Sequence, residues 1–179
     1  MSKLYHNSKY LLAPSLILVS LAGVIVGGPF AWTGVVLLFV GILIDTAIRK
    51  QSSSTMHGSD GETLANPAFQ NMVMYMMLPV FVLLQLALAW RVYGYMTGMP
   101  VEVTSMIWGV IPFTSGITGL DLIGATLSTG IFAGIGIIYG HELSHTKGFA
   151  FLISRMTMAL SGSAHFLSLI HISEPTRHA

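Results

Sequence analysis

The sequence predicts an all-α fold, a multi-pass transmembrane helix bundle with about four spans. Of its 179 residues, eight are Lys or Arg and seven are Asp or Glu, whereas 53% are hydrophobic. A soluble domain carries about a quarter charged residues, so this composition points to the lipid bilayer as a partner. The few charges are clustered, and the apolar windows between them approach the roughly 20 residues that a spanning helix needs.

The composition also excludes several kinds of function. The sequence contains no cysteine, which excludes disulfides, iron–sulfur clusters and thiolate metal sites. The formal net charge is +1, and no basic patch indicates a nucleic-acid partner. A metal ion would have to be bound by histidine or carboxylate, which suits zinc or non-haem iron.

Two apolar segments near the N-terminus predict a helical hairpin in the membrane. The first span runs from about Tyr10 to Val26, Gly27–Pro29 forms a turn, and the second span runs from about Phe30 to Ile48. Asp45 lies near the end of the second span, four residues before Arg49. It is either a functional carboxylate at membrane depth or the partner of that arginine at the interface.

A polar loop from Arg49 to Gln70 leads to the third span, from about Met72 to Trp90. Pro79 lies inside this span, where we expect it to kink the helix. The apolar segment Met106–Phe113 is too short and too interrupted to cross a bilayer. We therefore expect it to lie at the interface or to enter the membrane and return.

The fourth span is predicted from about Leu122 to Tyr139, with Asp121 capping its N-terminus. Gly130 and Gly134 in this span either allow another helix to approach closely or reflect the general frequency of glycine in membrane helices. The later apolar segment Phe149–Leu160 predicts a helix that lies along the membrane surface or re-enters it.

Lysines and arginines predict the orientation of the spans. In a four-span topology six of them fall on one side of the membrane, and Arg91 alone falls on the other. The positive-inside rule therefore places the N-terminus, the loop after the second span and the end of the fourth span in the cytoplasm. The six cytoplasmic residues are Lys3, Lys9, Arg49, Lys50, Lys147 and Arg155.

Two histidines stand at the end of the fourth span, in the segment Gly140–His145. His141 and His145 are four residues apart, so a helix presents both on one face, as two ligands of one metal ion require. Three hypotheses remain open: two interfacial histidines without metal, a membrane zinc metallopeptidase, or a membrane di-iron oxygenase. In the peptidase Glu142 would activate a zinc-bound water, but a third ligand would be needed downstream.

The residues around this pair resemble a known family. The segment Tyr139–Lys147 resembles the first histidine box of the alkane 1-monooxygenase family and its xylene monooxygenase relatives, commonly His-Glu-Leu-x-His followed by Lys or Arg. Ala159–Phe166 resembles the approach to the family's second box, often Gly-x-Gly-His-Phe. Thr146 departs from the usual basic residue, although Lys147 supplies a charge one place later. The resemblance covers about residues 8–166.

The resemblance implies a membrane-bound monooxygenase with two iron ions that hydroxylates a terminal or benzylic methyl group of a hydrocarbon with O2. His141 and His145 would be iron ligands, Glu142 would lie beside them without binding iron, and the role of His165, near the site, is left open. Fatty-acid desaturases share the di-iron design and a similar first box, so they remain an alternative.

The resemblance also implies partners and a location. Electrons would come from NAD(P)H through a reductase and then rubredoxin or ferredoxin. The protein would lie in the bacterial inner (cytoplasmic) membrane, with the histidine box facing the cytoplasm.

Residues 167–179 depart from the family pattern, which predicts further histidines after Phe166. They resemble the translation of a sequencing-library adapter, with a natural divergent C-terminus as the alternative. We therefore expect residues 1–166 to be the N-terminal part of a hydroxylase domain and 167–179 to be a non-native tail. His171, Glu174 and His178 would then not be ligands. Because two histidines cannot hold two irons, the truncated chain is expected to be inactive alone.

Overall fold

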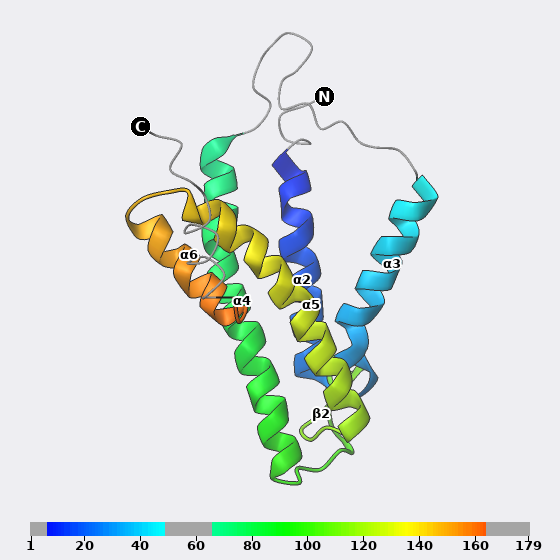
Figure 1. Cartoon of the computed structure of the whole chain (residues 1–179). Helices are drawn as coiled ribbons and strands as arrows, with labels where there is room; N and C mark the ends of the chain where they lie inside the picture. Colours follow the sequence, from blue (N-terminus) through cyan, green and yellow to red (C-terminus); the bar gives the residue numbers. More distant parts are fainter. Residues whose placement is uncertain (1–6, 49–65, 164–179) are drawn as a thin grey trace, which may run out of the picture.

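The computed structural model describes residues 7–48 and 66–163, and in this part it confirms the predicted all-α, multi-pass bundle (Figure 1). Four helical segments are long and apolar enough to cross a membrane. Each contains one of the four predicted spans or nearly matches it, and their bounds are Lys9–Val26, Gly28–Ile48, Pro67–Met96 and Gly119–Ser144.

The spans alternate in direction across the bundle (Figure 1). The N-termini of α2 and α4 and the C-termini of α3 and α5 lie at one end, which we call the histidine end. The opposite end, where two short strands connect α4 to α5, is the hairpin end. The helical elements are η1 (Lys9–Leu11), α2 (Leu12–Val26), η2 (Gly28–Trp32), α3 (Thr33–Ile48), α4 (Pro67–Met96), α5 (Gly119–Ser144) and α6 (Phe149–Leu160).

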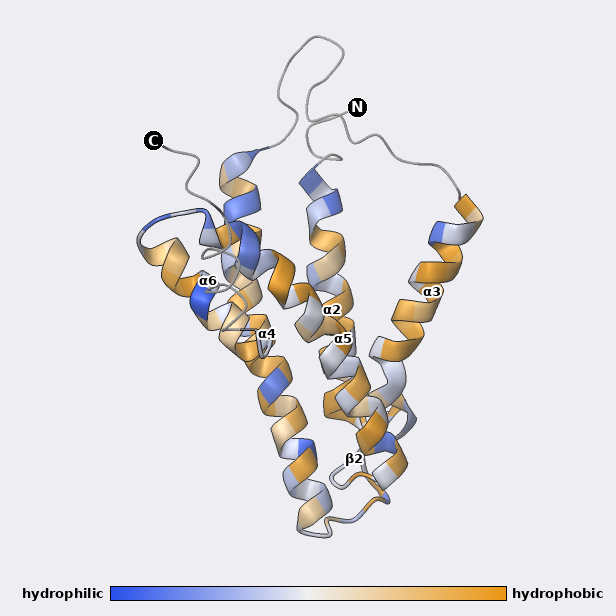
Figure 2. Cartoon of the chain, in the orientation of Figure 1, coloured by the Kyte–Doolittle hydropathy of each residue, from blue (hydrophilic) through white to orange (hydrophobic). Residues whose placement is uncertain are grey.

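Helices α2, α4 and α5 share one apolar core, whereas α3 stands at the edge of the bundle. In α3 only Gly34 is buried, and the surface of this helix is almost entirely hydrophobic (Figure 2). Apolar side chains on such a surface are suited to contact with lipid. Buried side chains from the other three helices form this core, among them Ile17, Val24, Met77, Phe81, Leu84 and Phe132.

Gly34 is the point at which α3 meets its neighbours. A Cβ atom built on Gly34 would lie 2.7 Å from Ser20 Oγ of α2 and 2.7 Å from Ser128 Cβ of α5. Real Cβ atoms do not come so close to other heavy atoms, so glycine permits this contact between three helices. The interhelical contact at Gly34 fixes the hairpin-end half of α3, and the rest of the helix diverges from α5 (Figure 1).

The third span, α4, is longer than the sequence predicted. Asn66 caps it, since its side-chain oxygen accepts hydrogen bonds from the backbone N–H groups of Ala68 (3.1 Å) and Phe69 (3.4 Å). Pro67 occupies the first position of the helix, where a missing N–H costs nothing. The helix continues through Pro79 without a break.

The segment Met106–Phe113, predicted to lie at the interface or to re-enter the membrane, forms part of a β-hairpin at the hairpin end of the bundle. Strands β1 (Val103–Ile107) and β2 (Ile111–Thr114) pair antiparallel, which the sequence analysis did not predict. The turn between them places Trp108 (φ 50°) and Gly109 (φ 70°) in the left-handed region, as a tight hairpin turn requires. The β-branched residues of this stretch favour strands, and that signal outweighs its overall apolar character.

Arg91 lies one residue beyond the predicted end of the third span, and the structure includes it in α4, near the end of the bundle opposite the histidines. It is completely buried, with 0% of its surface exposed. Its guanidinium donates hydrogen bonds to the carbonyls of Val24 (2.7 Å), Thr114 (2.7 Å) and Gly116 (3.2 Å), and to that of Ile25. Arg91 therefore joins the last turn of α2 to the end of the β-hairpin.

The predicted cap of α5 is one turn off. Thr118, not Asp121, is the N-cap residue. Its hydroxyl accepts a hydrogen bond from the Asp121 N–H (3.1 Å) and donates one to the Asp121 carboxylate (2.7 Å). This is a reciprocal capping arrangement, and the carboxylate of Asp121 also favours the positive end of the helix dipole.

The close helix contact, one of the two interpretations of Gly130 and Gly134, is absent from the described residues. A Cβ atom at either glycine would meet no atom within 4 Å. The tight contacts of α5 are found at other glycines: a Cβ on Gly136 would lie 3.2 Å from the ring of Phe81 in α4, and one on Gly140 would lie 2.7 Å from Met158 in α6. The second interpretation, a common membrane residue, therefore fits Gly130 and Gly134 here.

Helix α6 turns back beside α5 and α4 and does not extend away from the bundle (Figure 1). Of the two expectations for Phe149–Leu160, this arrangement favours re-entry. Ile153, Thr157 and Met158 are buried in the contact, and the hydroxyl of Ser154 donates to the carbonyl of Gly140. Helix α6 thus packs directly against the turn of α5 that precedes the histidines.

Candidate metal centre

The end of α5 brings His141 and His145 into direct contact. Their Nε2 atoms are 3.4 Å apart, and the ring centroids are 4.9 Å apart with the planes nearly perpendicular, at 89°. His141 lies in the last turn and His145 is the C-cap residue. The two side chains therefore have the one-face relation that the four-residue spacing predicts, and their ring nitrogens face each other.

This separation can be compared with that of two ligands of one metal ion. Histidine nitrogens bind zinc at about 2.0–2.1 Å, so two nitrogens in a tetrahedral site are about 3.4 Å apart. The observed 3.4 Å thus allows both imidazoles to bind one ion without moving. The same distance is compatible with a hydrogen bond in which one imidazole donates its proton to the other.

Local hydrogen bonds fix the backbone on which the histidines stand. The Ser144 hydroxyl donates to the carbonyl of His141 (2.6 Å), and the Thr146 hydroxyl donates to that of Leu143 (2.6 Å). Leu143 is buried, with 1% of its surface exposed. A pair of ligands on a fixed turn loses less conformational freedom when it binds a metal ion.

Two supports of this turn were not predicted from the sequence. Ser154 of α6 donates to the carbonyl of Gly140, and the absent side chain of Gly140 makes room for Met158. A serine in an apolar segment is only a weak sequence signal for such a contact between helices. The contact depends on how α6 folds back, which hydropathy does not determine.

The histidine pair lies on the side of α5 that faces away from the other described helices. Each residue of an α-helix is rotated by about 100° from the one before it. Viewed along the axis of α5, His141 and His145 therefore lie within an arc of about 60° that also contains four exposed residues. His145 is exposed and His141 is partly buried. The other members of this face are Ile123, Leu127, Gly130 and Gly134, all exposed.

Within residues 7–48 and 66–163 no third ligand joins the pair. No group of three or more His, Asp or Glu side chains in this part could hold a metal ion. Zinc sites use at least three protein ligands, and two irons need more. The pair could therefore supply two ligands of a centre whose other ligands lie outside the described helices, on the open face of α5.

Glu142 lines a separate hollow at the histidine end. This cavity has a volume of about 340 Å³ and lies between η1, α4 and α5. Tyr10 and Tyr139 are among its other lining residues. The predicted position of Glu142 beside the ligands follows from its place in the chain, and Glu142 also lines this hollow.

Several predicted site residues lie outside the described part of the chain. They are His165, the expected tail 167–179 with His171, Glu174 and His178, and Arg49, the expected partner of Asp45. Their roles stay predictions.

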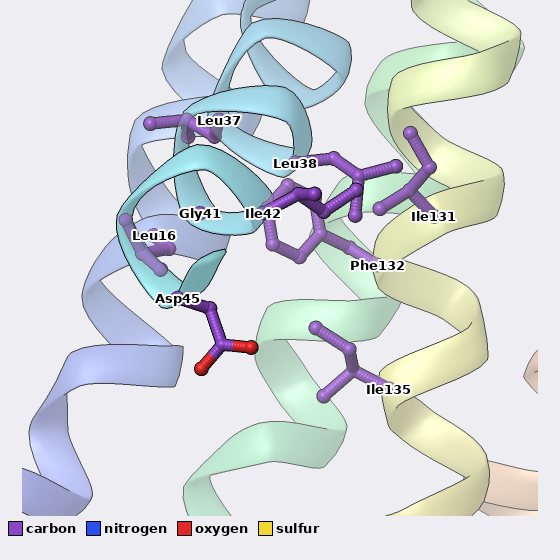
Figure 3. Close-up of a pocket in the computed structure, with 9 residues that line it drawn as sticks. All are labelled: Leu16, Leu37, Leu38, Gly41, Ile42, Asp45, Ile131, Phe132 and Ile135. Carbon is purple, nitrogen blue, oxygen red and sulfur yellow. The ribbon is translucent and has the colours of Figure 1, made fainter. Parts of the chain in front are cut away.

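Asp45 lines an apolar cavity of about 340 Å³ between α2, α3 and α5 (Figure 3). Leu16, Ile42 and Phe132 are among its walls, and Asp45 is its one charged lining residue. The cavity exists because α3 diverges from α5 beyond Gly34. Sequence reasoning identified Asp45 as a candidate but had no signal for the cavity, which depends on the angle between two helices.

In searches of protein families, curated proteins and solved structures, no match to this chain was found. The family resemblance therefore depends on the residues around the histidine pair.

Proposed function

We propose that residues 1–166 are the N-terminal part of a membrane-bound di-iron monooxygenase of the alkane hydroxylase type, which hydroxylates a terminal or benzylic methyl group of a hydrocarbon with O2. The observation that carries the proposal is the histidine pair in its box: two imidazoles at the end of an apolar helix, with Nε2 atoms 3.4 Å apart, inside the segment Tyr139–Lys147.

The described residues would contribute part of the iron centre. His141 and His145 would bind iron through Nε2, and the remaining ligands would come from later histidine boxes. When bound, the two irons supply the oxygen-activating chemistry, with electrons from NAD(P)H passed through a reductase and rubredoxin or ferredoxin. Packing by α6 would hold the two histidines in place, and Glu142 would influence them without binding iron.

The bundle contains a cavity of the kind that an apolar substrate would occupy. The cavity between α2, α3 and α5 is walled by leucine, isoleucine and phenylalanine side chains (Figure 3). The divergence of α3 separates its walls (Figure 1). A hydrocarbon chain dissolved in the bilayer could enter it without losing contact with apolar groups, since its transfer from lipid exposes no apolar surface to water. This supports a hydrocarbon over a water-soluble substrate.

A membrane zinc metallopeptidase is the second candidate, because residues 141–145 match His-Glu-x-x-His. The observed nitrogen separation suits one zinc as well as iron. A peptidase would also need a third ligand and a place for a peptide, and the described residues contain no third ligand beside the pair. A fatty-acid desaturase is the alternative within the di-iron class.

The test requires the complete reading frame, which sequencing of genomic DNA across codon 167 would provide. The full-length protein, supplied with its electron donors and ¹⁸O2, is expected to convert an alkane or a methylarene to an alcohol containing one ¹⁸O atom. Formation of an alkene from an acyl chain would indicate the desaturase. Cleavage of peptides with no oxygenated product would indicate the zinc enzyme.

A further inference from the structure

The hollow that contains Glu142 has features of a binding site in its own right. Four polar side chains converge on it from three elements: Tyr10 of η1, Gln70 of α4, and Tyr139 and Glu142 of α5. Its apolar lining is formed by Val73, Met74 and Ile138. We propose that this hollow binds an amphiphile with a primary ammonium head, such as an aminophospholipid.

The charge of the lining determines the sign of the ligand. Glu142 is the one acidic side chain among the residues that line the cavity, and no basic side chain lines it. The tyrosine hydroxyls and the amide oxygen of Gln70 are hydrogen-bond acceptors, and the faces of the two tyrosine rings attract cations. An ammonium group, with three donors and no acceptor, is complementary to this set.

The location of the hollow indicates the chemical nature of the rest of the ligand. Lys9–Val26 and Pro67–Met96 begin, and Gly119–Ser144 ends, at the histidine end. Tyr10, Gln70 and Glu142 therefore stand at the level where head groups meet the apolar part of a bilayer. Met74 and Ile138 lie deeper along their helices, where an acyl chain would continue from the head.

The size fits a head group and the start of a chain. A volume of about 340 Å³ is at the small end of the range of about 300–1,000 Å³ for ligand pockets. It would hold on the order of ten water molecules. The site is distinct from the histidine pair, which lies on the open face of α5, and the inference does not depend on iron binding.

Native mass spectrometry of the purified chain, exchanged into equal mixtures of lipids, tests the inference. We expect phosphatidylethanolamine to be retained about tenfold more than phosphatidylcholine, whose quaternary ammonium has no N–H group to donate, because one hydrogen bond to a charged partner accounts for about such a factor. Soluble ethanolamine forms a second arm: displacement of the lipid by ethanolamine alone would show that the head suffices, and no displacement would show that the chain is needed.

Variants identify the site. Glu142→Gln keeps the shape and removes the charge, so the preference for phosphatidylethanolamine should disappear. Ile138→Trp should fill the hollow and lower retention of every lipid there, and Ile138 is 63% exposed, so the change should not disturb the core. Ile137→Trp, one residue away and outside the lining, is the matched control and should bind as the unmodified chain does.

Equal retention of the two lipids, or a preference that survives both Glu142→Gln and Ile138→Trp, would overturn the inference. Thermal unfolding of each variant shows whether a loss of binding comes from a loss of fold. Should Ile138→Trp unfold, Gln70→Leu, which removes an acceptor from the same hollow, replaces it with the same expected direction.

Discussion

The two histidines at the end of α5 have a geometry that a metal ion could use as it stands. Their nitrogens face each other at 3.4 Å, close to the separation of two ligands in a tetrahedral site. Their surroundings differ from those of a complete centre, because the pair faces away from α2, α4 and α6. At the scale of the residue, two histidine ligands are therefore in place, and the side of the pair that faces away from the helices is open to further ligands.

Arg91 is the most heavily hydrogen-bonded side chain in the described residues and makes a stability prediction. Its loss would leave the carbonyls of Val24, Thr114 and Gly116 without their donor in a buried site. Arg91→Met should lower the free energy of unfolding by about 3 kcal/mol or more, because each buried group left unpaired costs about 1–3 kcal/mol. Unfolding in detergent measures the change.

Arg155→Met is the matched control for Arg91→Met. Arg155 is exposed on α6, and surface substitutions usually change stability by less than about 0.5 kcal/mol. If the two variants were equally stable, the buried guanidinium would not be the connection between α2 and the hairpin that its hydrogen bonds indicate.

At the scale of the element, α3 depends on one glycine for its position. Gly34→Ala would place a methyl group 2.7 Å from Ser20 Oγ and from Ser128 Cβ. Overpacking of this kind typically costs about 1–3 kcal/mol, and α3 should move outward. The measurement is unfolding stability, together with the distance between spin labels on α3 and α5.

For Gly130→Ala, in contrast to Gly34→Ala, we expect no loss of stability. No atom lies within 4 Å of a Cβ at Gly130, and alanine favours a helix over glycine by up to about 1 kcal/mol. The variant should be as stable as the parent chain or slightly more stable. A clear loss of stability would show that the Gly130 face is covered by a helix in the assembled protein.

The elements could be predicted from the sequence to the extent that they depend on hydropathy. Four apolar windows define the four spans, because a bilayer allows few other solutions. The β-hairpin and the cap at Thr118 were not predicted, and the sequence left open whether a helix covers the face at Gly130. Each depends on the geometry of a local turn or on which helix packs against a given face. The hydropathy of a single sequence determines neither the angles between helices nor which helices are neighbours.

The candidate site was predictable to a similar degree. The spacing of His141 and His145 predicts their contact, since four residues make about one helical turn. The supports from Ser154 and Gly140 depend on the return of α6, and the cavity at Asp45 depends on the divergence of α3. Such features follow from tertiary packing, which the periodicity of one helix does not contain.

At the scale of the whole molecule, the topology predicts which ends of the helices face the cytoplasm. The chain has no cysteine, so single cysteines can be introduced without a prior change. Lys147→Cys, at the histidine end, should react with a membrane-impermeant maleimide from the cytoplasmic side only. Val110→Cys, 77% exposed in the β-hairpin, should react from the other side only. Labelling of both from one side would contradict the four-span topology, and exchanged sides would reverse its orientation.

The central claim is that the histidine pair binds iron in a di-iron centre, and the metal content of the full-length protein tests it most directly. We predict about two irons per chain, a marked loss of iron in His141→Ala and in His145→Ala, and retention of iron in Glu142→Gln. One zinc per chain, or an iron content that both histidine variants leave unchanged, would contradict the claim.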